Sequence, residues 1–215
     1  MLMSTFNKKW LALLLATLLT AACQSGPERT SAPIPEVESA PLLEPAATPE
    51  PEDFNQQVYA KAIASLKKGD TESALKLLQQ LSSDAPGKPR VFTNLGLAYF
   101  KLQQLELAAE AFQEAVQRDG DDAVAHNHLG ILQRRRGEFE AARQSYQRAI
   151  DIDSDYAPAY LNLGILFDIY FQNLAKALQH YHKYQALISD KDSQVAGWIT
   201  DIERRLKSGG SSSQG

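Results

Sequence analysis

The pair Leu95-Gly96 recurs as Leu129-Gly130 and again as Leu163-Gly164, at a constant spacing of thirty-four residues. A fixed period of this length is typical of helical repeat proteins, in which each repeat forms one pair of helices and stacks on the next. We therefore expect an all-α chain whose regular part is an array of helix-turn-helix units.

Aligning the sequence at this period gives four units, with bounds 55–88, 89–122, 123–156 and 157–190. A small residue occupies the position of Gly96 in every unit, and alanines such as Ala108 follow it in the second half of the first three units. The apolar residues of each second half return at helical spacing, which predicts one buried stripe. Lys68-Gly69-Asp70 and Arg136-Gly137-Glu138 predict turns between the two helices of a unit.

The pattern is similar to the tetratricopeptide repeat. The similarity is carried by Asn94-Leu95-Gly96-Leu97-Ala98-Tyr99, followed by Ala108, Phe112 and Ala115. It covers residues 55 to about 190 and implies a right-handed superhelical array of helix-turn-helix units. The first unit departs from the pattern at Ser65, and the fourth carries one extra residue in Tyr170-Phe171-Gln172-Asn173. Such departures are typical of terminal repeats, which have a neighbour on one side only.

One further helix is predicted after the fourth unit, at 191–207. Its apolar residues recur at helical spacing: Val195, Trp198, Ile199, Ile202 and Leu206. This stripe suits a capping helix that covers the last repeat. Residues 208–215 are expected to form a flexible tail.

The first 22 residues have the organisation of an export signal. Lys8 and Lys9 precede an apolar run from Trp10 to Ala22, which is shorter than the roughly 20 residues of a membrane span. The small residues before Cys23 resemble the lipobox of bacterial lipoproteins, whose cysteine is lipidated and becomes the mature N-terminus. The resemblance is incomplete because Thr20 stands where that family usually has leucine.

Gln24 follows the cysteine, and by resemblance to enterobacterial sorting it implies the outer membrane, with the protein facing the periplasm. An ordinary signal peptide with an incidental Cys23, or a short uncleaved anchor, is the alternative. Residues 23–54 then comprise the lipidated cysteine and a tether, since seven of the ten prolines lie between Gln24 and Asp53. Few large apolar residues occur there, so we expect a stiffened, disordered spacer rather than a ligand for an SH3-like groove.

Composition and motifs exclude several classes of function. Residues 55–207 hold equal numbers of basic and acidic side chains, whereas nucleic-acid binding needs a basic face. The single cysteine excludes an intrachain disulfide. The sequence contains no HExxH, Gly-x-Ser-x-Gly or P-loop motif, so we expect a non-enzymatic protein without a cofactor.

The four histidines form two pairs, His126 with His128 and His180 with His182. Residues two apart on a helix point about 200° apart, so neither pair can chelate a metal through one face. We expect no metal site. His126 replaces Phe92 of the preceding unit and is expected to pack between helices.

The family resemblance implies that the first helices of successive units line a concave groove, which presents four ladders of equivalent residues. They are Ile63, Leu97, Ile131, Ile165; Tyr59, Thr93, Asn127, Leu161; Leu66, Phe100, Arg134, Asp168; and Lys67, Lys101, Arg135, Ile169. An apolar floor edged by cations suits an extended or helical peptide that carries some negative charge. The alternative is that the cations only complement the helix dipole.

These features together predict a scaffold that is anchored in the bacterial envelope by a lipid and binds protein or peptide partners of a larger envelope machine. The stretch from Leu161 to Leu166, with Lys176-Ala177-Leu178 and Val195-Ala196-Gly197-Trp198-Ile199, resembles repeat lipoproteins associated with TonB, ExbB and ExbD energy-transducing systems. Pilotin-like factors for type IV pilus secretins and adaptors for peptidoglycan enzymes share the same plan. A periplasmic enzyme or metal protein without a recognisable motif is the alternative from another class.

Overall fold

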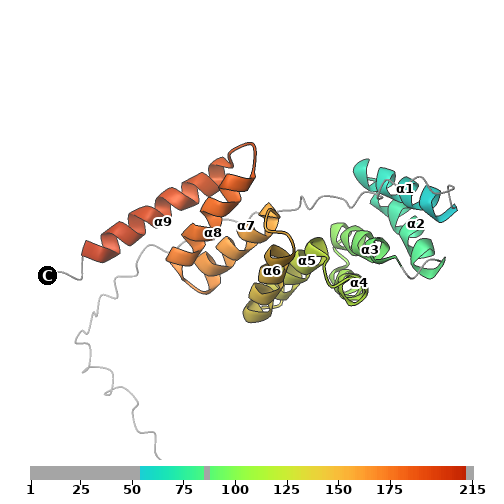
Figure 1. Ribbon diagram of the computed structural model, residues 1–215, viewed down its shortest axis with the longest axis horizontal. Helices are drawn as coiled ribbons and strands as arrows, with labels where there is room; N and C mark the ends of the chain where they lie inside the picture. The colour runs from blue at the N-terminus through green and yellow to red at the C-terminus, as the bar shows by residue number, and fades with distance from the viewer. Residues whose placement is uncertain (1–53, 85–87, 212–215) are drawn as a thin grey trace, which may run out of the picture. The chain divides into compact units, whose positions relative to one another are not determined.

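The computed structural model describes residues 54–84 and 88–211, which form nine α-helices, one π-helix and no strand (Figure 1). The all-α prediction is confirmed. The helices are α1 (Phe54–Lys67), α2 (Thr71–Asp84), α3 (Pro89–Lys101), α4 (Leu105–Arg118), α5 (Ala123–Arg135), α6 (Phe139–Ile152), α7 (Ala157–Ile165), η1 (Leu166–Tyr170), α8 (Leu174–Leu187) and α9 (Ser193–Ser211). The predicted signal, lipid site and tether lie outside the described residues, apart from Phe54.

The helices pair in chain order, as expected for a solenoid. Within the units, α1 contacts α2, α3 contacts α4, α5 contacts α6, and α7 contacts α8 (Figure 1). Each second helix also contacts the first helix of the following unit, and α8 contacts α9. In addition, successive first helices touch one another directly, α1 with α3, α3 with α5, and α5 with α7. This third set of contacts decides which residues of the first helices remain exposed.

Close packing inside a unit depends on the small residue of the first helix. An added Cβ at the glycine would lie 2.5–2.7 Å from ring carbons of the unit's second helix. The pairs are Gly96 with Phe112, Gly130 with Tyr146, and Gly164 with Tyr181. In the first unit the equivalent residues, Ala62 and Leu78, are both fully buried. A larger residue on one helix is therefore matched by a smaller one on its partner.

The extra residue of the fourth unit is absorbed by the π-helix η1. In η1 the Phe171 amide donates to the Leu166 carbonyl, five residues back, at 3.1 Å. The turn residue with positive φ consequently falls one place later than its equivalents: Gln172 takes the role of Gly69, Gln103 and Gly137. The extra residue therefore lies within η1, whereas the sequence pattern placed it in Tyr170-Phe171-Gln172-Asn173.

Helix α9 covers α8, the last helix of the fourth unit. Val195 and Ile202 are each 1% exposed, and the Trp198 ring lies 5.5 Å from that of Tyr181. Leu206 is 41% exposed and does not join this contact, and the helix continues past residue 207 to Ser211. No helix in the described part of the chain combines the length and apolar character needed to cross a membrane.

Candidate functional site

The ladder predicted as an exposed apolar floor is buried. Ile63, Leu97, Ile131 and Ile165 are 3%, 5%, 1% and 1% exposed. The expectation of an open apolar surface is therefore wrong. The physical reason is that successive first helices touch one another as well as the second helices, which leaves these side chains buried in the packed array instead of exposed to solvent. Their apolar character is explained by core packing.

The second ladder is also buried, and its polar members join one repeat to the next. Asn94 donates to the Tyr59 hydroxyl at 2.7 Å, and Asn162 donates to the Asn127 side-chain oxygen at 3.0 Å. The Thr93 hydroxyl donates to the Asp122 carboxylate. Leu161, the last member, is 2% exposed. Buried polar groups need hydrogen-bond partners, and these residues find theirs within the array. The presence of polar residues in this ladder is therefore explained by the stability of the fold.

Asp122 was not singled out from the sequence, although its position offered a signal. It lies immediately before α5, and its Oδ1 accepts a hydrogen bond from the Ala125 amide at 2.9 Å as the helix N-cap. Aspartate is one of the residues preferred at this position. The same carboxylate receives the Thr93 hydroxyl, so one side chain both starts α5 and ties it to α3.

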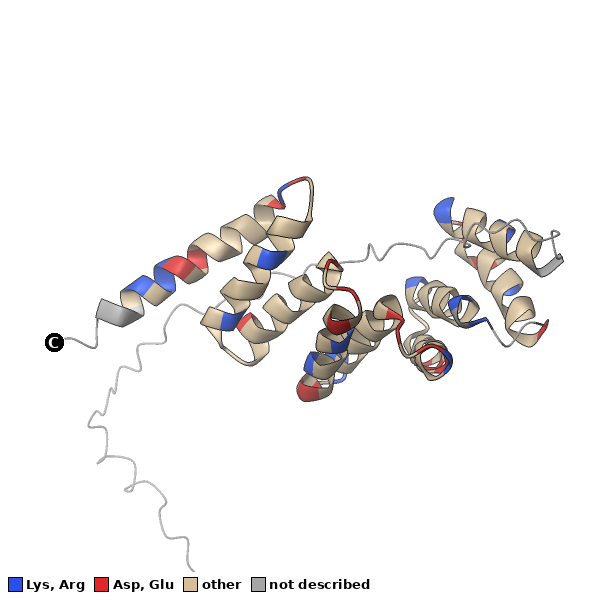
Figure 2. Ribbon diagram, in the orientation of Figure 1, with Lys and Arg blue, Asp and Glu red and all other residues tan. Residues whose placement is uncertain are grey.

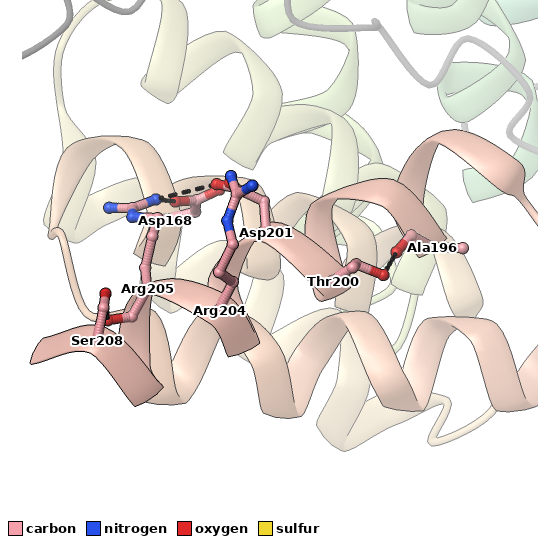
Figure 3. Close-up of polar contacts among 7 residues, drawn as sticks. All are labelled: Asp168, Ala196, Thr200, Asp201, Arg204, Arg205 and Ser208. Carbon is pink, nitrogen blue, oxygen red and sulfur yellow. Dashed lines mark hydrogen bonds and ion pairs between the residues drawn. The ribbon is translucent and has the colours of Figure 1, made fainter. Parts of the chain in front are cut away.

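The third ladder changes from apolar to charged along the array. Leu66 and Phe100 are 2% and 3% exposed, and Arg134 and Asp168 are each 8% exposed. Helix α9 extends this series, because Arg205 Nη1 lies 3.8 Å from Asp168 Oδ1 (Figure 3). This pairing could not be predicted from the sequence, since the two residues belong to different helices.

Arg205 is held from its own helix as well. Its Nη1 lies 3.7 Å from Asp201 Oδ2, one turn back (Figure 3). Figure 2 shows basic and acidic segments next to one another along the second half of α9. Arg205 is therefore paired with one carboxylate of the array and with one of its own helix.

Only the fourth ladder is exposed along its whole length. Lys67, Lys101 and Arg135 are exposed, and each is the last residue of its first helix. We call these three residues the cationic strip. The Arg135 guanidinium lies 5.7 Å from the centre of the Phe100 ring, a cation–π distance that links two neighbouring units. Ile169, the fourth member, is 40% exposed.

The histidine that packs in the core is His128 and not His126. Its Nδ1–H donates to the Val124 carbonyl at 2.8 Å. The imidazole stacks on Phe112 at 4.9 Å and meets the edge of Phe100 at 5.5 Å. Burial lowers the His128 pKa to about 4, so the ring is neutral at neutral pH.

His126, which was expected to pack between helices, is only partly buried. Its Nε2 lies 3.2 Å from the Gly120 carbonyl, and desolvation lowers its pKa. His180 stacks on Phe167 at 5.5 Å, and desolvation also lowers its pKa. Within residues 54–84 and 88–211, no three His, Cys, Asp or Glu side chains gather closely enough to hold a metal ion.

Comparison with protein families gives one description for the array. The family model described as tetratricopeptide repeat matches residues 59–123, 94–157 and 127–191. These overlapping matches span most of the described residues. No curated protein matches the sequence.

Solved structures with the same fold include proteins of different origin. MamA is 26% identical, with a TM-score of 0.52 over 63% of this chain and 74% of that chain. PilF of Pseudomonas aeruginosa is 20% identical, with a TM-score of 0.63 over 72% and 69%. The first repeat domain of Spaghetti (RPAP3), solved with the HSP90 peptide SRMEEVD, is 21% identical, with a TM-score of 0.51 over 56% and 93%.

Proposed function

The chain belongs to the tetratricopeptide repeat family, and we propose that it is a non-catalytic scaffold that captures a protein partner along the cationic strip. The observation that carries this proposal is the exposure of Lys67, Lys101 and Arg135 at equivalent ends of consecutive first helices, beside ladders that are buried. A row of exposed cations favours a partner segment with carboxylates.

The comparison structures support a binding role in general terms. The domain of Spaghetti (RPAP3) was solved with a bound peptide that contains two glutamates and an aspartate. Peptide capture by an array of this fold is therefore physically possible. The type of partner that the present chain binds depends on the residues of its own cationic strip.

Capture by the strip predicts a specific loss on charge reversal. Replacing Lys101→Glu together with Arg135→Glu turns attraction for an acidic segment into repulsion, so we expect most of the partner to be lost. The measurement is in-cell photo-crosslinking from a reactive residue placed at Ile169, which is exposed and lies outside the mutated pair.

The matched control reverses two exposed lysines away from the strip, Lys76→Glu on α2 and Lys207→Glu on α9. The net charge change is the same in both variants, so long-range electrostatics is held constant. Equal capture by the two variants, with far-UV circular dichroism unchanged, would contradict a role for the strip.

We further propose that the scaffold is anchored at the outer membrane through lipidated Cys23, with residues 24–53 as a spacer. The support is the sequence alone: the apolar run, the small residues before the cysteine and the proline-rich stretch. Thirty residues at about 3.1 Å each would let the array work up to roughly 90 Å from the membrane surface. A TonB-type energy-transducing complex is our finer proposal for the machine that it serves.

The anchor gives a prediction of its own. With Cys23→Ala we expect the protein to leave the outer-membrane fraction, because stable anchoring needs acyl chains at that residue. Fractionation and radiolabelled palmitate incorporation measure this directly. Retention of the variant in the outer membrane would show that another feature holds the protein there.

A further inference from the structure

We propose that the ligand of the cationic strip is a polyproline-II segment with an acidic residue at every third position, followed by an apolar residue. This inference rests on the proposed function and adds the conformation and spacing of the bound segment. It follows from the regularity of the strip and from the residue that ends it.

The strip has a fixed step. Lys67, Lys101 and Arg135 are each thirty-four residues apart and occupy the same helical position, the C-terminal residue of α1, α3 and α5. These three helices touch in succession. The axes of packed helices lie about 8–10 Å apart, so the helix ends that carry neighbouring cations are separated by a similar step.

A ligand must present carboxylates at that same step on one edge. Polyproline II has three residues per turn and rises about 3.1 Å per residue, so side chains three apart lie on one edge about 9 Å from each other. A β-strand cannot do this, because residues three apart point to opposite faces. The conformation that fits is therefore polyproline II.

The fourth position of the ladder supplies a second specificity element. Ile169 occurs thirty-four residues after Arg135 and is one of three exposed large apolar residues in the described part of the chain. The helix that carries it, η1, follows α7, which touches α5. A ligand that continues beyond Arg135 towards η1 can therefore meet the exposed Ile169 side chain, which favours an apolar residue at that end of the ligand.

An α-helical ligand is the competing occupant. Acidic residues seven apart on a helix rise about 10 Å and share one side, which also approximates the step. A helix is about 10–12 Å in diameter, however, and needs an open channel along the array. The first three ladders are buried, so among the four ladders only the cationic strip and Ile169 are exposed. A narrow polyproline-II segment fits a single row of exposed residues better than a helix does.

The test is fluorescence anisotropy with the purified full chain and three labelled, capped peptides. The first contains three Glu-Pro-Pro units followed by Leu. The second has the same composition with its three glutamates adjacent, and the third is a helical peptide with glutamate at every seventh residue. We expect the first peptide to bind about tenfold more tightly than the other two, and Lys101→Glu to remove that advantage.

Lys76→Glu is the matched control, and we expect it to keep the preference for the first peptide. Equal binding of the first and second peptides would overturn the register, because only total charge would then matter. Tighter binding of the third peptide would overturn the polyproline-II conformation. Neither result decides whether the chain captures a partner in cells, which the photo-crosslinking experiment tests separately. A failure of the polyproline-II proposal can therefore be distinguished from a failure of the proposed scaffold function.

Discussion

Gly130→Ala is expected to destabilise the protein by about 1–3 kcal/mol, although alanine is the better helix former. The added Cβ would lie 2.6 Å from Tyr146 Cε1 and 2.7 Å from its Cδ1. The Tyr146 ring is fully buried and cannot move aside without disturbing the core. Urea denaturation followed by circular dichroism measures the free energy of unfolding.

A glycine-to-alanine substitution elsewhere in the chain serves as a control, because its expected effect on the free energy of unfolding has the opposite sign. Gly197 lies within α9, is exposed, and has no atom within 4 Å of an added Cβ. Gly197→Ala should therefore raise the free energy of unfolding by about 1 kcal/mol, the helix-propensity difference. If both substitutions were stabilising, close packing at Gly130 would not be the constraint that the structure indicates.

A compensating change tests the pairing itself. The first unit already combines alanine with a smaller partner, as Ala62 with Leu78. Tyr146→Leu should accordingly reduce the cost of Gly130→Ala, so that the double variant is more stable than the sum of the single effects predicts. Strict additivity would contradict direct contact between the two positions.

The second large effect is a loss of stability in mild acid that is due to His128. Its pKa is lowered from 6.5 to about 4 by burial, so between these values the unfolded chain binds a proton that the folded chain does not. The free energy of unfolding therefore falls as the pH drops from about 6.5 towards 4, by about 3 kcal/mol in total. Denaturation curves at several pH values within this window measure the loss.

His128→Asn is the matched variant, because asparagine occurs at the equivalent positions of the second and fourth units. There Asn94 donates to the Arg90 carbonyl four residues back, as His128 does to Val124. The variant should lose some absolute stability with the ring contacts, yet show a shallower dependence on pH. Desolvation also lowers the pKa values of His126 and His180, which contribute equally to both proteins. Parallel pH curves would contradict the assignment to His128.

The array itself could be predicted because its signals are local and repeated. Glycines such as Gly96 and alanines such as Ala108 recur at one period, and each marks a close approach between adjacent helices. Insertion of one residue in the fourth unit was visible as a shift of Ala177 and Tyr181. Its accommodation by a π-helix was not, since a helix can add a residue at more than one place.

The candidate site was predicted less well. The positions of the four ladders follow from the period, but Leu97 and Ile131 fit an exposed floor and a buried core equally well in sequence. Contacts between successive first helices decide the matter in favour of burial. In the same packed array, the residues of the cationic strip, Lys101 and its equivalents, remain exposed to solvent.

The sequence by itself thus determined the helical units, their order and the small residues that let them pack, because these depend on neighbours close in the chain. The tertiary structure alone decided which ladder meets solvent, where Arg205 meets Asp168, and which histidine is buried between Phe100 and Phe112. These outcomes depend on distances between helices far apart in sequence. Periodicity fixes equivalence between positions, but exposure depends on how closely the equivalent helices approach.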